Sequence, residues 1–214
     1  MDYVPIMLRV CDRTVVILGG GQTAARKARS FVGNSRRIIV IASEFCEDFP
    51  ISGITRIETT LYAPEEVENY LDPRSIVIIA TDDDPLNDAI EIKCKERGIM
   101  YNRVDDCDSD FIFPAVAESN GVLVAVSTLG KSPSFAGFLR SILKEELEKY
   151  SVALPAIERL RNNVLIPDLD ERAKFFKSVL ADSEFWRLVK EGRLKDAVKY
   201  GRHMEDLFLS GQVQ

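Results

Sequence analysis

The first hundred residues contain short apolar runs separated by amphipathic segments. The runs at 14–18, 38–42 and 76–80 are rich in Val and Ile, which is typical of strands buried on both faces of a sheet. Further strands are expected at 54–61, where polar and apolar residues alternate, and at 100–104. The alternation of strands with helices predicts right-handed βαβ units on a parallel sheet.

Helix-start and helix-stop signals mark the segments between these strands. A helix is expected from residue 23 to about residue 32, where Gly and Asn follow. Pro64 opens a shorter helix. Asp84 is expected to cap a longer helix whose first turn contains Pro85 and which ends at Gly98.

The pattern changes after residue 104. Two β-rich runs flank the segment S-N-G, and Asn120–Gly121 between such runs indicates a hairpin. A loop G-K-S-P then precedes a helix of about twenty residues whose apolar positions have helical spacing. From about Ser151 the sequence is helical, with breaks at Pro155, Pro167 and Gly192. These changes predict three regions, at residues 1–112, 113–150 and 151–214.

Composition narrows the possible functions. The 214 residues carry a net charge of −6, which argues against a nucleic-acid partner because phosphate binding needs a basic face. No apolar run has the length of a membrane span, and the N-terminus lacks the features of a signal peptide, so we expect a cytoplasmic protein. Four cysteines without C-x-x-C spacing and a single histidine predict neither a disulfide framework nor a multi-histidine metal site.

A glycine-rich turn follows the first predicted strand. Gly19, Gly21 and Ala24 form the pattern G-x-G-x-x-A between a strand and a helix, which is the context of a dinucleotide-binding turn. The alternative is a turn that serves packing only. Ser43 and Glu44 follow the second strand, where an acidic residue usually binds the adenosine ribose. The missing arginine slightly favours NAD, although the choice between NAD and NADP stays open.

An acidic loop follows the predicted strand at 100–104. Its aspartates are Asp105, Asp106, Asp108 and Asp110, and mutual repulsion is expected to raise the pKa of at least one of them. Such a carboxyl group would suit proton transfer. The alternative is an ordinary solvated loop. Cys107 within the loop is a poor transition-metal ligand without a nearby histidine, so no metal site is predicted.

Five colinear segments across residues 3–148 together carry a family resemblance. They are V-P-I-M-L-R-V-C-D-R-T-V-V-I-L-G-G-G-Q-T-A-A-R-K-A, I-A-T-D-D-D-P-L-N, N-R-V-D-D, D-F-I-F-P-A and V-A-V-S-T-L-G-K-S-P. The chain closely resembles the siroheme synthase N-terminal family, whose members are precorrin-2 dehydrogenases, some with sirohydrochlorin ferrochelatase activity. The resemblance implies an α/β fold with a Rossmann-type parallel sheet, an α+β dimerisation region and a small all-helical C-terminal domain.

The resemblance also implies roles for individual residues. The reaction would be the oxidation of precorrin-2 to sirohydrochlorin with NAD as acceptor, in a homodimer, and Asp105 would be the general acid/base. NAD contacts would come from Gly19, Gly21, Gln22, Thr23, Ser43, Glu44 and Thr81. Contacts to the tetrapyrrole substrate would come from the loop residues Ser127, Thr128 and Lys131. Some members of the family have a serine at the position of Thr128, where phosphorylation can occur. The threonine in this chain puts such regulation in doubt.

The substrate's chemistry adds one expectation. Precorrin-2 carries eight carboxylates, so an acidic protein needs a locally basic pocket to bind it, and Arg103, Lys131 and Arg140 could supply charge-assisted contacts. The alternatives to a dehydrogenase are a bifunctional enzyme that also inserts Fe²⁺ or Co²⁺, a non-catalytic NAD-sensing module and, more weakly, an S-adenosylmethionine methyltransferase.

Overall fold

The computed structural model describes residues 3–106 and 108–212. The chain divides into two compact units, Met1–Phe113 and Pro114–Gln214, which are described separately. Within the described residues, no helix is long and apolar enough to cross a bilayer.

The first unit is built on a five-stranded sheet in the order β3-β2-β1-β4-β5. All neighbouring strands are parallel, as the alternation of strands and helices predicted. The register places Leu18 between Ile41 and Ile79 in the centre of the sheet. The strands are β1 (Thr14–Leu18), β2 (Arg37–Ala42), β3 (Thr55–Glu58), β4 (Ile76–Ile79) and β5 (Met100–Arg103).

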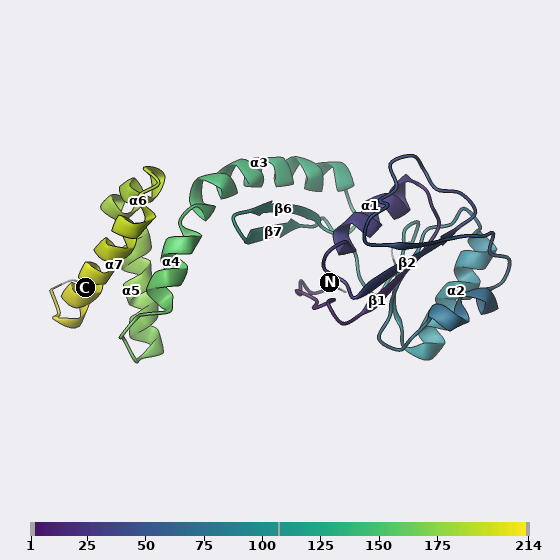
Figure 1. Ribbon diagram of the computed structural model, residues 1–214, viewed down its shortest axis with the longest axis horizontal. Helices are drawn as coiled ribbons and strands as arrows, with labels where there is room; N and C mark the ends of the chain where they lie inside the picture. The colour runs from purple at the N-terminus through teal and green to yellow at the C-terminus, as the bar shows by residue number, and fades with distance from the viewer. Residues whose placement is uncertain (1–2, 107, 213–214) are drawn as a thin grey trace. The chain divides into compact units, whose positions relative to one another are not determined.

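Alternate residues of the central strands face two different cores. One core contains Val16 and Val77 with the buried residues of α2 (Asp84–Arg97) and of the 3₁₀ helix η1 (Pro64–Tyr70). The other contains Val15 and Ile78 with the buried alanines of α1 (Gln22–Phe31). Figure 1 shows α1 and α2 on opposite sides of the sheet. Both faces are therefore covered, which explains why these strands are continuously apolar.

Local signals set the ends of the α2 helix. The side chain of Asp83 accepts a hydrogen bond from the backbone N–H of Leu86 at 3.0 Å, so Asp83 is the N-cap and the prediction of Asp84 was wrong by one residue. Three consecutive aspartates offer the same chemistry, and only the helix register distinguishes them. Gly98 ends the helix in the left-handed conformation at φ 63°, as its position after Arg97 predicted.

The second unit begins with the predicted hairpin. Strands β6 (Ala115–Ser119) and β7 (Val122–Val126) pair antiparallel, and Asn120 and Gly121 form the turn with φ of 47° and 81°. Positive φ at both central residues is the type I′ geometry that Asn-Gly favours. The long helix α3 (Pro133–Ser151) packs along both strands.

Four further helices follow α3 and enclose a core of their own. Phe175, Val179 and Phe185 are almost completely buried in this core, together with Leu160 and Met204. Gly201 allows a close approach, because a Cβ atom there would lie 2.5 Å from a methyl group of Leu160. The helices are α4 (Leu154–Arg161), α5 (Leu169–Ala181), α6 (Ser183–Lys190) and α7 (Leu194–Leu209).

Candidate active site

The order of the strands marks a switch point at the carboxyl edge of the sheet. The chain leaves β1 toward β2 on one side, whereas β4 lies on the other side of β1, so the direction of winding changes between β1 and β4. Ligands of doubly wound sheets bind beyond the carboxyl ends of the strands at such a point. Gly19 follows β1 and Thr81 lies just beyond β4, so both predicted cofactor residues belong to this edge.

Three consecutive glycines follow β1, and each has a different environment. Gly19 has φ 112°, and a Cβ atom there would lie 2.1 Å from the carbonyl oxygen of Ala80. A Cβ atom on Gly20 would lie 1.8 Å from the carbonyl oxygen of Glu44, whereas one on Gly21 would meet nothing within 4 Å. Gly19 and Gly20 are therefore required by packing, and the space beside Gly21 is open for a ligand.

The N-terminus of α1 has the features of a phosphate-binding helix end. The helix begins directly after Gly21, its first turn contains no acidic residue, and Gln22 is exposed. Unpaired backbone N–H groups and the helix dipole favour an anion at such a position. Ala24 is completely buried, as the small third position of the glycine pattern predicted. These residues fit the pyrophosphate of a dinucleotide.

Ser43 and Glu44 follow β2, where the adenosine ribose was predicted to bind. Both residues are exposed, and the carbonyl oxygen of Glu44 approaches Gly20. The backbone N–H of Cys46 donates to the carbonyl oxygen of Gly20 at 2.9 Å, which joins this loop to the glycine turn. The side chains of Ser43 and Glu44 are therefore available to a ligand at this edge.

Thr81 is fixed by a buried asparagine that the sequence pattern did not single out. The Thr81 hydroxyl donates to Oδ1 of Asn87 at 2.5 Å, and Nδ2 of Asn87 donates to the carbonyl oxygen of Thr81 at 3.0 Å. Asn87 is completely buried. Its two hydrogen bonds close the turn between β4 and α2 and fix the backbone of Thr81 at this edge.

Asp105 follows β5 at the same edge and forms an ion pair with Arg103. The Arg103 Nε donates to Oδ1 of Asp105 at 2.9 Å, and Nη2 donates to Oδ2 at 3.3 Å. These hydrogen bonds lower the pKa of Asp105 from its ordinary value. The expectation that repulsion raises an aspartate pKa is therefore wrong for Asp105, because the nearest charge is a cation.

Arg103 is surrounded by carboxylates of its own chain. Besides Asp105, it contacts Asp88, Glu91 at 3.3 Å and Asp84 at 3.8 Å, and only 10% of its side chain is exposed. Its pKa is raised, chiefly by hydrogen bonds to Asp105 and Asp88. The role of Arg103 in substrate binding stays a prediction, and it would require these ion pairs to open.

Two other aspartates of the acidic loop accept hydrogen bonds from the backbone. Oδ1 of Asp106 accepts from the backbone N–H of Asp108 at 2.9 Å, and Oδ2 of Asp110 accepts from that of Tyr101 at 3.1 Å. Cys107 lies outside the described residues. Across the part of the chain that the structure describes, no group of three or more His, Cys, Asp or Glu side chains is arranged to hold a metal ion.

The predicted substrate loop belongs to the second unit. The Thr128 hydroxyl donates to the carbonyl oxygen of Ser132 at 3.1 Å and accepts from its N–H at 3.0 Å, and Ser127 accepts from the N–H of Leu129. These contacts form a tight turn before α3. Lys131 and Arg140 are exposed. The roles of Ser127, Thr128, Lys131 and Arg140 toward the substrate stay predictions.

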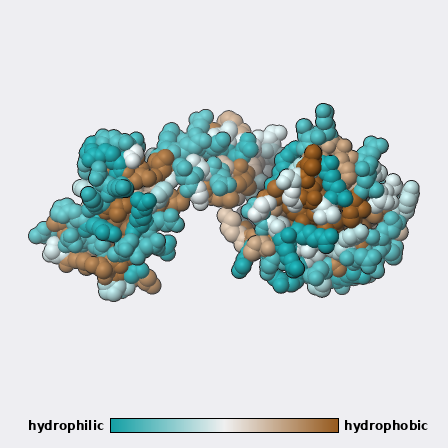
Figure 2. Space-filling view, viewed as in Figure 1, coloured by the Kyte–Doolittle hydropathy of each residue, from teal (hydrophilic) through white to brown (hydrophobic). Residues whose placement is uncertain are grey.

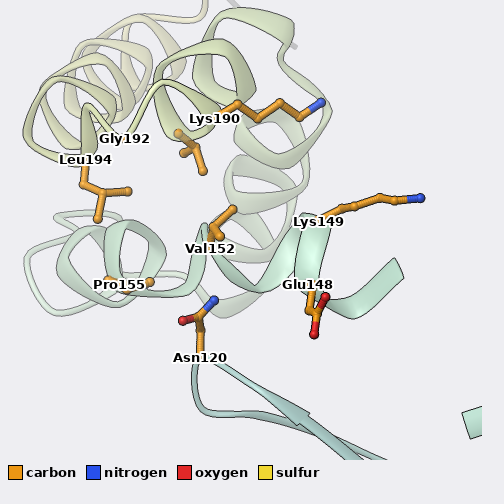
Figure 3. Close-up of a pocket in the computed structure, with 9 residues that line it drawn as sticks. Asn120, Glu148, Lys149, Val152, Pro155, Lys190, Gly192 and Leu194 are labelled. Atoms are coloured by element: carbon orange, nitrogen blue, oxygen red, sulfur yellow. The ribbon is translucent and has the colours of Figure 1, made fainter. Parts of the chain in front are cut away.

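A hollow of about 500 Å³ also belongs to the second unit (Figure 3). Its apolar wall includes Val152, Pro155 and Leu194, and the side chains of Lys149 and Lys190 extend outward from it. Its charged groups are exposed, and none of the predicted cofactor, substrate or catalytic residues lines it. The sheet edge therefore remains the better candidate for chemistry.

Several residues of the site were not predicted from the sequence. Gly20 and Glu91 act through contacts with Glu44 and Arg103, which are distant in the sequence, so no local spacing marks them. Asn87 bonds to Thr81 six positions earlier, a contact that no motif marks. Asn102 is the nearest to a recognisable signal, because it begins the segment N-R-V-D. Its Nδ2 donates to the carbonyl oxygen of Phe111 at 2.9 Å, and its buried Oδ1 has no hydrogen-bond partner within the described structure.

A family model confirms the class of protein that this edge defines. Residues 6–115 match the family described as "Putative NAD(P)-binding", and the chain belongs to this family. The match covers the whole sheet and its glycine turn. It confirms the predicted nicotinamide dinucleotide cofactor at the level of the family.

The relatives place the chain more narrowly, in the siroheme synthase N-terminal family, as its motifs predicted. It is 32% identical to the siroheme synthase of Photorhabdus laumondii over an alignment that covers 100% of this chain and 46% of that protein. It is also 32% identical to the siroheme synthase of Tolumonas auensis, covering 89% and 41%. The chain thus spans about half the length of these curated relatives.

A solved structure shares the fold. The protein named "SirC, precorrin-2 dehydrogenase" superposes with a TM-score of 0.71 and 18% sequence identity, covering 92% of this chain and 100% of that one. At this level of identity the likeness supports the architecture and leaves the residue roles to be argued from the site.

Proposed function

We propose that this protein oxidises precorrin-2 to sirohydrochlorin, with NAD as the hydride acceptor and Asp105 as the proton acceptor. The observation that carries the proposal is the position of Asp105. It follows β5, whose neighbour β4 leads into Thr81, and Thr81 lies beside Gly19 of the dinucleotide turn. The relatives' names add the substrate class.

The residues divide the chemistry between them. Bound NAD supplies the redox step, since it accepts a hydride. The backbone of α1 beside Gly21 binds the pyrophosphate, and Ser43 and Glu44 bind the adenosine ribose. Asp105 takes the proton that the substrate loses, and its lowered pKa means that the carboxylate is ionised and able to accept it. Because the carboxylate is already ionised, we assign it the role of base in the oxidation.

An anaerobic assay tests this proposal directly. Purified protein incubated with precorrin-2 and NAD should form NADH and sirohydrochlorin in equal amounts. Asp105→Asn should bind NAD as the wild type does and lose most turnover, about 100-fold or more, as general-base loss typically costs. Asp106→Asn is the matched control, because its carboxylate accepts a hydrogen bond from the backbone N–H of Asp108 in the same loop. Unchanged turnover of Asp105→Asn would refute its role, and NAD binding without any oxidation would favour a sensing module.

Metal insertion into sirohydrochlorin can be tested with the same purified protein. Mixing the protein with sirohydrochlorin and Fe²⁺ or Co²⁺ in the absence of NAD separates chelation from oxidation. We limit the proposal to the dehydrogenase, because the described residues provide a base and a dinucleotide edge for oxidation.

We also propose that the protein is a homodimer that associates through α3 and the hairpin. Apolar side chains reach the surface along these elements (Figure 2). Phe135 and Phe138 stack with ring centroids 6.2 Å apart, and their exposed fractions are 51% and 57%. Exposed apolar side chains of this kind mark protein interfaces. Ile142 and Leu143 are also exposed on α3, and Val116 and Leu123 are exposed on the hairpin.

A further inference from the structure

The guanidinium of Arg103 joins Asp105 to helix α2. Its Nε and Nη2 donate to the two oxygens of Asp105, at 2.9 and 3.3 Å, which is a bidentate arrangement. Its Nη1 points the other way and donates to Oε2 of Glu91 at 3.3 Å and to Asp88. One planar group therefore spans the distance between the acidic loop and the helix.

Glu91 is the best-anchored of the carboxylates on α2 that contact Arg103. Only 11% of its side chain is exposed, compared with 64% for Asp88 and 78% for Asp84. Its Oε1 accepts from the hydroxyl of Tyr101 at 3.1 Å and from the ammonium of Lys95 at 2.7 Å. Glu91 thus links α2 to β5 and cannot move without breaking several contacts.

Asp105 lies in a loop, and 42% of its side chain is exposed. Its carboxylate interacts with its own backbone and with Asp84 as well as with Arg103, and the hydrogen bonds from Arg103 have the largest effect. Arg103 therefore makes the main contribution to its orientation. A carboxylate that must meet one position of a bound substrate gains from such support, because a displacement of about 1 Å can reduce a rate about 100-fold.

We propose that Arg103, held in place by Glu91, is a positioning residue that orients the carboxylate of Asp105 for proton transfer. This inference rests on the proposed function of the site. It differs from the expectation that Arg103 binds substrate carboxylates, since the same guanidinium cannot make both sets of contacts at once.

Arg103 also balances the negative charge around Asp105. The groups that face this guanidinium are Asp84, Asp88 and Glu91 of α2 and Asp105 of the loop, with Lys95 and Tyr101 bound to Glu91 and Asp106 next along the loop. Without Arg103, Lys95 is the one cation left among these groups, and it is bound to Glu91. The pKa of Asp105 then rises, because its partner cation is lost and like charges disfavour ionisation.

The experiment compares Arg103→Gln, Arg103→Lys and Glu91→Gln with the wild type. Glu68→Gln is the matched control, because Glu68 pairs with Lys93 and Arg97 of α2 and does not touch Arg103. Two quantities are measured for each protein: the pKa of the Asp105 carboxyl by NMR titration, and kcat and KM for precorrin-2 between pH 5 and 8. The titration needs no turnover, so it distinguishes failure of this inference from failure of the proposed function.

A positioning role for Arg103 changes kcat and the pKa of Asp105 more than KM. Arg103→Gln and Glu91→Gln lower kcat about tenfold or more with KM little changed. Arg103→Gln raises the pKa of Asp105 and brings an acid limb into the kcat profile. Arg103→Lys keeps the lowered pKa but not the full kcat, because an ammonium lacks the bidentate fork. Glu68→Gln matches the wild type.

Two results would overturn it. An increase in KM for precorrin-2 in both Arg103 variants, with kcat and the Asp105 titration unchanged, would make Arg103 a substrate-binding residue. Equal losses of kcat in Glu91→Gln and Glu68→Gln, with an unchanged Asp105 titration, would show that the contacts between Glu91, Arg103 and Asp105 contribute only to folding.

Discussion

Gly19 lies so close to Ala80 that a Cβ atom on the glycine would be 2.1 Å from the alanine's carbonyl oxygen. This contact joins the ends of β1 and β4, where the direction of winding changes. The backbone at Gly19 also has φ 112°, which L side chains rarely adopt. The glycine turn is therefore part of the fold before any ligand binds.

Gly19→Ala should destabilise the protein in the absence of dinucleotide. The expected loss is about 2 kcal/mol or more, because backbone strain of about 1–3 kcal/mol adds to the clash with Ala80. Urea unfolding of the apo-protein measures it. A midpoint equal to that of the wild type would show that the turn can relax around the added methyl group.

Gly21→Ala should weaken NAD binding and leave the stability of the apo-protein unchanged. Nothing lies within 4 Å of the added Cβ atom, and the backbone at Gly21 has φ −75°, which alanine adopts easily. The apo-protein should unfold at the wild-type urea concentration, whereas NAD affinity should fall about tenfold or more, because the methyl group occupies the approach of the pyrophosphate. Calorimetric titration with NAD tests this, and unchanged affinity would place the pyrophosphate elsewhere.

Lys27→Met should change how stability depends on pH. Burial, with repulsion by Arg26, lowers the pKa of Lys27 to about 8, compared with 10.5 for the ordinary group. Between these values the unfolded state binds more protons, so the free energy of unfolding of the wild type rises with pH. The Phe113 ring, 3.7 Å from the ammonium, attracts the cation and moderates this rise.

The variant lacks this titration. The free energy of unfolding of Lys27→Met, relative to that of the wild type, should therefore be higher at pH 7 than at pH 10. Urea unfolding at both pH values measures this difference. A difference of the opposite sign would show that the contact with Phe113 outweighs burial.

Cys94 should resist alkylation in the native protein. It is completely buried, and burial raises the pKa of its thiol to about 12, so the reactive thiolate is scarce at neutral pH. Cys11 is exposed and serves as the internal control. Peptide mapping after brief iodoacetamide treatment at pH 8 should find Cys11 labelled and Cys94 unlabelled, and both labelled in urea. Native labelling of Cys94 would indicate that α2 opens from the sheet.

Phe138→Glu should weaken self-association. A carboxylate in the middle of the exposed apolar surface of α3 would have to be desolvated in a dimer, which is costly for an unpaired charge. Sedimentation velocity should show a dimer for the wild type and a monomer for the variant. Lys144→Glu on the exposed, charged part of α3 is the control and should remain a dimer.

The sequence by itself determined the parallel sheet, the glycine turn and the hairpin. Each depends on local conformational preferences. Runs of β-branched residues favour strands that are covered on both faces. Gly19 adopts φ 112°, and Asn120 and Gly121 adopt the positive φ values of a hairpin turn. The family motifs are also local in this sense, since they depend on residue types at fixed spacing. Local preference was not enough at Asp83 and Asp84, where identical side chains compete for one cap.

Only the tertiary structure decided the electrostatics of the acidic loop. Four aspartates in six residues suggested repulsion, yet Asp105 faces a guanidinium that three carboxylates of α2 also contact. Those carboxylates lie 14 to 21 positions earlier in the sequence, and they meet the loop only because α2 packs beside β5. The sign of a pKa shift depends on distances between charges, and these distances are set by packing.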